Sequence, residues 1–444
     1  MDESLMLVIY FLLFLQIILI EILRSKAKFF DFFSFANFIF LLVYVITPVY
    51  YELWSEGNIY ANIDNSYEVV VYTVIGYQFL WIGWILGTYK RISNISLKKN
   101  DSDRKWIKGS IGAMWIVFFL FLVLTIDRGG LSQSIGAGAL SRYNYEEIET
   151  SRFAFFSRVV SLSPFLTAIF LFYVIKPSLD YNRQKVKYYY FFSFSISLLQ
   201  TFIGASRGGL LRLFLLQFLV FVLVKRNVKI VNLAALCFLI LLVISYGKQT
   251  FYAVSNFFYY GESLTDSFNY LNTIRGTDDK STLDVFFNEF SHPIKSLNVA
   301  VQYNGDRYSY TYFNDFIWAI IRILPQRLTS MILSRPDTVT SINTYLITDN
   351  YATSIPPGIV GTFYYSLGGV GVVLGMLAYG FTGSVFNKKL LKQQRSNKVY
   401  VVPFVFFSFF YGFFITNGDP NVYIYYILMP VLFIILAPKY RTLK

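Results

Sequence analysis

The feature of this sequence that most constrains its fold is a series of apolar runs, each about 20 residues long and nearly free of charge. A helix of that length crosses roughly 30 Å of hydrocarbon. In lipid, every backbone polar group must also be bonded within its own segment. The sequence therefore predicts an all-α polytopic membrane protein with about 11 transmembrane helices. The runs lie near residues 5–23, 30–48, 68–89, 107–126, 153–175, 188–205, 207–224, 229–246, 358–381, 399–416 and 420–437.

Basic residues are concentrated in alternate connections between these runs. The chain has 39 Lys and Arg against 26 Asp and Glu, a formal net charge of +13. Most of the basic residues fall within 24–28, 90–108, 176–187, 225–229, 388–398 and the C-terminal tail. By the positive-inside rule these segments are cytoplasmic, which predicts an N-terminus outside and a C-terminus inside. This distribution accounts for the net charge, so we expect no nucleic-acid partner.

The composition argues against redox and metal chemistry. Cys237 is the only cysteine, which excludes an intrachain disulfide and disfavours a thiolate metal site. The predicted outer segments contain no Asp-x-Asp pair, and the adjacent Asp278 and Asp279 follow a glycine in a turn-like sequence. We therefore expect no cofactor and no bound metal.

One connection is much longer than the others. Residues 1–246 hold the first eight predicted helices, residues 247–357 form an extracytoplasmic loop, and residues 358–444 hold the last three helices and a cytoplasmic tail. Loops of this length are usually functional. We expect short amphipathic helices within it.

The first amphipathic helix is predicted around residues 283–290, where apolar side chains recur with helical spacing between Leu283 and Phe290. Glu289 and His292 are three residues apart on its polar side. Pro293 is predicted to end this helix and to hold His292 in an extended conformation. His292 is the only histidine in the chain.

A second apolar piece, residues 313–324, is too short to span a bilayer and contains Arg322, with Arg327 just beyond it. We interpret it as re-entrant or interfacial. It would bring two guanidinium groups to the outer membrane surface, where they bind either a ligand or lipid phosphates.

Arg207 occupies a tight turn, Gly204-Ala205-Ser206-Arg207-Gly208-Gly209, between the sixth and seventh runs. Small neighbours let a large ligand approach the guanidinium, whose planar donors suit a diphosphate. The alternative is that Arg207 caps the carbonyls that end the sixth helix. Arg212 lies deeper and should need a partner within the protein.

The ninth run contains Gly371 and Gly375 with GxxxG spacing. This spacing lets two helices approach closely. We predict a packing role rather than a contact with substrate.

The many runs, the long outer loop before the last three helices and the Gly-Ala-Ser-Arg-Gly-Gly turn together resemble the Wzy-type O-antigen and oligosaccharide repeat unit polymerases. The resemblance covers the layout of the whole chain. It implies a metal-independent glycosyltransferase of the bacterial inner membrane that uses undecaprenyl-diphosphate-linked oligosaccharides as donor and acceptor. It also implies a flippase and a chain-length regulator as partners.

Glycosyl transfer of this kind needs fixed positive charge at the departing diphosphate and a base near the attacking hydroxyl. Arg207, Arg322 and Arg327 are the candidates for the charge. Glu289 is the first candidate for the base, followed by His292.

Two other functions are consistent with the same pattern. An O-antigen ligase shares the lipid-linked donor and the outer arginines, but it delivers a finished polysaccharide to lipid A core. A flippase for the same lipid would favour internal repeats, broken helices and charged groups within the spans. We find no repeat, and apart from Arg212 and Glu21 the runs are nearly free of charge.

Overall fold

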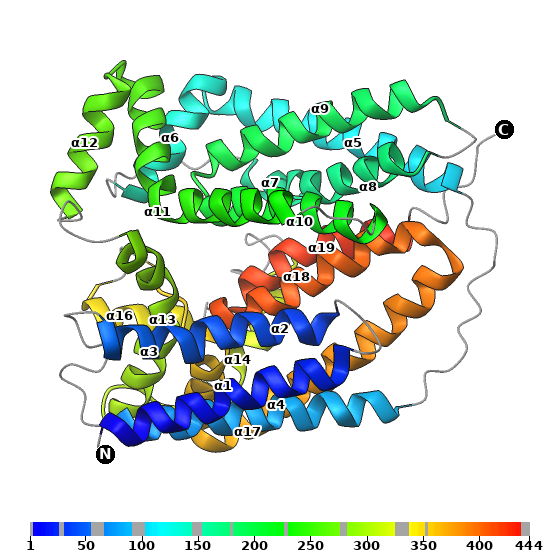
Figure 1. Ribbon diagram of the computed structural model, residues 1–444. Helices are drawn as coiled ribbons and strands as arrows, with labels where there is room; N and C mark the ends of the chain where they lie inside the picture. The colour runs from blue at the N-terminus through cyan, green and yellow to red at the C-terminus, as the bar shows by residue number, and fades with distance from the viewer. Residues whose placement is uncertain are drawn as a thin grey trace. The chain divides into compact units, whose positions relative to one another are not determined.

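The computed structural model describes residues 3–25, 31–54, 66–90, 103–143, 153–177, 181–225, 230–275, 282–324, 337–350 and 354–436. These residues are almost entirely helical (Figure 1). The chain divides into two compact units. Unit 1 comprises residues 1–95, 287–392 and 407–425, and unit 2 comprises residues 96–286, 393–406 and 426–444.

Unit 1 is built from the N-terminal part of the chain, most of the predicted outer loop and parts of the last three predicted runs. Its helices are α1 (Glu3–Ser25), α2 (Phe32–Leu41), the π-turn η1 (Leu42–Ile46), α3 (Thr47–Trp54), α4 (Ser66–Tyr89), most of α13 (Thr282–Gln302), α14 (Asn314–Ile321), α16 (Val339–Thr348) and most of α17 (Gly358–Ser396).

Unit 2 contains the middle of the chain. Its helices are α5 (Asp103–Asp127), α6 (Leu131–Tyr143), η2 (Ala154–Phe156), α7 (Ser157–Val160), α8 (Ser163–Ile175), α9 (Arg183–Ile203), α10 (Arg207–Lys225), α11 (Ile230–Tyr260), α12 (Leu264–Arg275) and η3 (Lys398–Tyr400). Both units receive parts of α18 (Val401–Asn417) and α19 (Pro420–Leu436).

Nine helices in the described part of the chain are long and apolar enough to cross a membrane. The protein is therefore an all-helical, multi-pass membrane protein. The predicted runs 188–205 and 420–437 coincide with α9 and α19, which are not among the nine. The count of eleven spans stays a prediction.

The eighth predicted run ends near residue 246, within a longer helix. Helix α11 continues to Tyr260, because residues beyond the run are also buried. Phe251 packs against Ala205 and Phe202, and Ser255 donates to the Ile135 carbonyl.

Two helices of unit 1, α4 and α17, pack with direct backbone contact. A Cβ atom at Gly83 would meet the Leu377 carbonyl, and one at Gly380 would meet the Leu80 carbonyl. Small residues permit this spacing between membrane helices. The close contact makes α4 and α17 a rigid pair of helices within unit 1.

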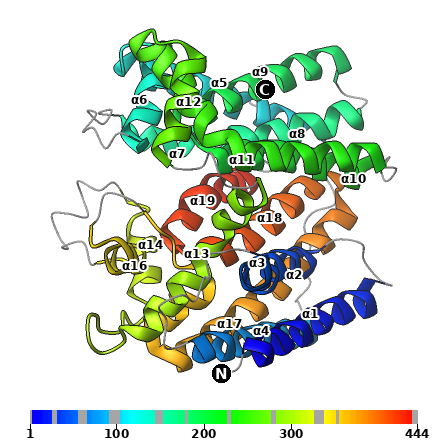
Figure 2. The same ribbon diagram turned by 60° about the vertical axis from the view of Figure 1, so that its left-hand side comes forward.

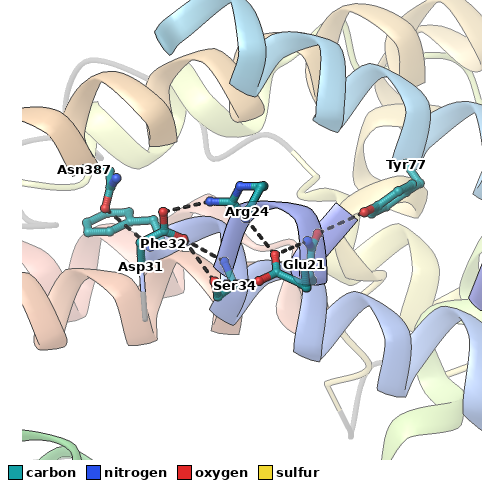
Figure 3. A network of polar contacts seen from close by, with 8 residues as sticks. Glu21, Arg24, Asp31, Phe32, Ser34, Tyr77 and Asn387 are labelled. Atoms are coloured by element: carbon teal, nitrogen blue, oxygen red, sulfur yellow. Dashed lines mark hydrogen bonds and ion pairs between the residues drawn. The ribbon is translucent and has the colours of Figure 1, made fainter. Parts of the chain in front are cut away.

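A polar network joins α1, α2, α4 and α17 at one end of unit 1 (Figure 3). Arg24 Nη1 lies 2.7 Å from Glu21 Oε1, and its Nη2 lies 2.7 Å from Asp31 Oδ2. The guanidinium carbon lies 4.5 Å from the Phe33 ring centroid. The other side chains of the network are Ser34, Asn37, Tyr77 and Asn387.

We call this end of unit 1 the basic end, because Arg24, Lys90 and Lys388 lie there; Lys388 Nζ donates to the Gly87 and Lys90 carbonyls. The opposite end holds α13, α14 and α16, which lie side by side in both views (Figures 1 and 2). We call it the loop end. The positive-inside rule predicts that the loop end faces outside.

Candidate functional site

The centre of the loop end is a sharp turn inside α17. Leu367 has φ −156° and ψ 31°, and Gly368 has φ 60° and ψ −146°, so neither residue is helical. The first part of α17 folds back, and Phe363 contacts Gly371 and Gly375. In a straight helix residues 363 and 375 would be about 18 Å apart. Gly371 and Gly375 thus have the predicted packing role, but within one helix.

The turn leaves two carbonyls of α17 without helical partners, and the 303–313 segment supplies new ones. The Thr311 N–H donates to the Tyr365 carbonyl, and the Tyr312 N–H donates to the Ser366 carbonyl, both at 3.0 Å. To do so, Tyr312 and Phe313 adopt left-handed φ values of 49° and 60°. Such strain costs about 1–3 kcal/mol per residue and is often found at functional sites.

The strained segment leads directly into α14, which carries a buried carboxyl group. Asp315 is 3% exposed. Its Oδ1 accepts a hydrogen bond from the Val339 N–H at 3.0 Å, while its Oδ2 has no hydrogen-bond partner among the described residues. Burial, with the neighbouring Asp419 carboxylate, raises the pKa of Asp315 to about 6, against the lowering effect of the Val339 N–H.

A second carboxylate lies at the same end of α16. Asp419, in the connection between α18 and α19, accepts a hydrogen bond from Thr340 Oγ1 at 2.8 Å. Val339 and Thr340 are the first two residues of α16, so both carboxylates lie at its positive end. This interaction favours charged carboxylates, whereas burial favours a neutral Asp315.

Asn343, one turn further along α16, holds the surrounding helices together. Its Nδ2 donates to Ser296 Oγ at 2.9 Å and to the Ile355 carbonyl at 2.8 Å. Its Oδ1 accepts from Tyr365 Oη at 3.0 Å. These bonds connect α13, α16 and α17, so Asp315 lies on a rigid support.

Glu289 and His292 lie half-buried on α13, one turn apart. The prediction that Pro293 ends this helix and holds His292 extended is wrong, because α13 continues to Gln302. Proline removes one hydrogen bond from a helix. The following turns are nevertheless held by burial, since Ile294 and Leu297 are fully buried.

Arg322 is the C-terminal cap of α14 and is half-buried. It follows Asp315 by two helical turns, so the two residues fall on the same face, about 10 Å apart along the axis. The structure thus places one predicted guanidinium on the same helix as a carboxyl group that the prediction did not include. Arg327 lies outside the described residues.

Arg207 is in unit 2, at the first position of α10. Its Nη1 donates to the Ile244 carbonyl on α11 at 2.8 Å, and its aliphatic stem covers Gly247. Arg212 is 8% exposed, with its guanidinium carbon 3.6 Å from the Tyr426 ring centroid, which supplies the expected partner.

The residues that sequence reasoning missed are Asp315, Asp419 and Asn343. One signal was available, because Asp315 is an acidic residue within an apolar piece, and such residues are often functional. The pairing of Asp315 with residues more than 20 positions away had no sequence signal. No protein-family model, no curated protein and no solved structure matches this chain.

Proposed function

We propose that the protein polymerises undecaprenyl-diphosphate-linked oligosaccharide units into O-antigen or a similar surface polysaccharide, on the outer face of a bacterial inner membrane. The observation that carries the proposal is Asp315 at the loop end. It is a buried carboxyl group with a pKa of about 6 and an oxygen that no described group bonds. A general base works best when its pKa lies near the working pH.

In the proposed reaction, the bond between the anomeric carbon of the donor and the diphosphate oxygen breaks, and the diphosphate leaves with the electron pair. The acceptor hydroxyl attacks the anomeric carbon, and its proton passes to Asp315. Arg322, two turns away, offsets charge on the departing diphosphate. Glu289, His292 and Arg207 are the further candidates that the sequence pattern supplies.

The test is complementation of a gene deletion in the host. Wild type, Asp315→Asn and Asp337→Asn are compared by the ladder of the surface polysaccharide on a gel. Asp337 is an exposed carboxylate two residues before Val339 and serves as the matched control. We expect cores with a single repeat unit in the deletion strain, full rescue by Asp337→Asn, and polymerisation about 100-fold slower with Asp315→Asn.

A normal ladder in the deletion strain would refute the polymerase. Bare cores with accumulated lipid-linked polymer would instead indicate the ligase.

One observation favours a second function, the flippase. Helix α17 is broken at Leu367 and Gly368, and transporters often bind substrate at broken helices. In that case the deletion strain would accumulate single lipid-linked units on the cytoplasmic side, and the cores would be bare.

A further inference from the structure

Four tyrosines gather around the α17 turn at the loop end: Tyr72, Tyr310, Tyr312 and Tyr364. We call them the tyrosine cluster. Tyr72 and Tyr364 meet edge to face, with ring centroids 4.9 Å apart, and Tyr310 and Tyr312 are 6.5 Å apart at 81°. Asn304 Nδ2 donates to Tyr310 Oη at 2.7 Å and also interacts with Tyr364.

The turn itself gives the cluster its shape. A Cβ atom at Gly368 would lie 2.6 Å from Tyr310 Oη, and one at Gly369 would lie 2.8 Å from the Tyr72 ring. The rings therefore lie directly on the backbone of the turn. They can do so because Gly368 and Gly369 lack a side chain.

Charged groups border the cluster. The exposed carboxylate of Glu68 interacts electrostatically with Tyr364. The exposed Arg307 has its guanidinium carbon 4.5 Å from the Tyr303 ring centroid. Aromatic rings, phenolic hydroxyls, one amide and the Glu68 carboxylate are thus close together, and Arg307 lies over Tyr303, the chain neighbour of Asn304.

An aromatic belt at the membrane surface is the simpler interpretation of exposed tyrosines. It explains why the Tyr312 ring is 64% exposed. It does not explain why the backbone that carries this ring is also fixed on α17, where the Tyr312 N–H donates to the Ser366 carbonyl. Belt tyrosines also direct their hydroxyls to lipid headgroups, whereas Tyr310 bonds Asn304.

We propose that the tyrosine cluster is a binding subsite for a neutral oligosaccharide. The ring of Tyr312 packs on the C–H face of a pyranose, and the half-buried Asn304 amide and Tyr72 hydroxyl bind its hydroxyl groups, while the buried Tyr364 ring supports Tyr72. Tyrosine supplies rigid, amphipathic contact area at low entropic cost. The inference rests on the proposed function only for the identity of the ligand, the repeat unit of the host's polysaccharide.

The test uses the full chain in lipid nanodiscs and measures its affinity for the free repeat-unit oligosaccharide, released from the host's polysaccharide. The variants are Tyr312→Ala, Tyr310→Phe and Tyr345→Ala. Tyr345 is an exposed tyrosine on α16, outside the cluster, and is the matched control.

We expect Tyr312→Ala to weaken binding about fivefold to tenfold, the size of one aromatic contact. Tyr310→Phe should weaken it less, and Tyr345→Ala should leave it unchanged. Equal affinity for the wild type, Tyr312→Ala and Tyr345→Ala would overturn the subsite, as would a wild type that does not bind the oligosaccharide.

The binding measurement and the gene-deletion test of the proposed function can fail independently of each other. If the deletion strain makes a normal ladder and Tyr312→Ala still loses affinity, the polymerase is wrong and the subsite stands. If the ladder requires the gene and the cluster variants bind normally, the subsite is wrong and the polymerase stands.

Discussion

Replacing Arg24 by methionine should destabilise unit 1 strongly, because two carboxylates would lose their shared cation. Asp31 and Glu21 each have an oxygen 2.7 Å from the guanidinium. Removing one partner of a fully buried ion pair costs about 3–5 kcal/mol. The side chains here are 21% exposed for Arg24, 28% for Glu21 and 6% for Asp31. We therefore expect about 2–3 kcal/mol, between the buried and the surface limits.

The free energy of unfolding can be measured in detergent micelles by titration with a denaturing detergent. Arg24→Lys keeps the charge but loses the planar fork, so we expect an intermediate loss. In a double-mutant cycle, Arg24→Met with Asp31→Asn should cost at least about 1 kcal/mol less than the sum of the single changes. A loss below about 0.5 kcal/mol for Arg24→Met, typical of a surface pair, would refute the reasoning.

Three further changes test the loop end and the arginine turn. Gly368→Ala should destabilise the protein by about 2–4 kcal/mol, since a Cβ is strained at this φ and meets the Tyr310 hydroxyl; an unchanged thermal midpoint would contradict the turn. Burial raises the pKa of Asp315 in the folded protein to about 6, so the free energy of unfolding should fall by about 3 kcal/mol as the pH rises from 4 to 6. Asp315→Asn should remove that decline. Parallel pH profiles of the wild type and Asp315→Asn would disprove the raised pKa. Gly247→Ala should displace the aliphatic stem of Arg207, which would lie 2.6 Å from the new Cβ. Both Gly247→Ala and Arg207→Ala should therefore shorten the polysaccharide. A normal ladder for Gly247→Ala beside a lost ladder for Arg207→Ala would show that the position of the stem is unimportant.

The membrane-spanning architecture could be predicted because a bilayer leaves the backbone few choices. Apolar runs of about 20 residues must be helical in lipid, and the described residues of every predicted run are mainly helical, although the ninth run is broken at Leu367 and Gly368. Helix ends were less predictable. Helix α11 continues beyond the eighth predicted run to Tyr260, and Pro293 suggested an end that α13 does not have. In both places burial further along the helix outweighed the local preference.

The glycine-rich run was a sequence signal for the turn in α17, but we interpreted it as packing between two separate helices. The run from Gly361 to Gly375 is rich in glycine, which is typical of close packing between separate helices. The sequence cannot say whether the close partner is another helix or the same chain folded back. That choice depends on the two hydrogen bonds from Thr311 and Tyr312, which cap the opened carbonyls.

Those two bonds connect the candidate site to the fold. The backbone of Thr311 and Tyr312 is fixed on α17, and Phe313 begins α14 in a left-handed conformation, so Asp315 can reach the first N–H of α16. The same constraint exposes the Tyr312 ring. Strain in two residues therefore holds a buried carboxyl group and an exposed aromatic ring in a fixed relation. Because Asp315 needs this geometry, Phe313→Gly, which relaxes the left-handed backbone but removes the ring contacts with Phe316 and Phe363, should lower stability and loosen the site. If Phe313→Gly instead left polymerisation as fast as in the wild type, the left-handed backbone would have no role in positioning Asp315.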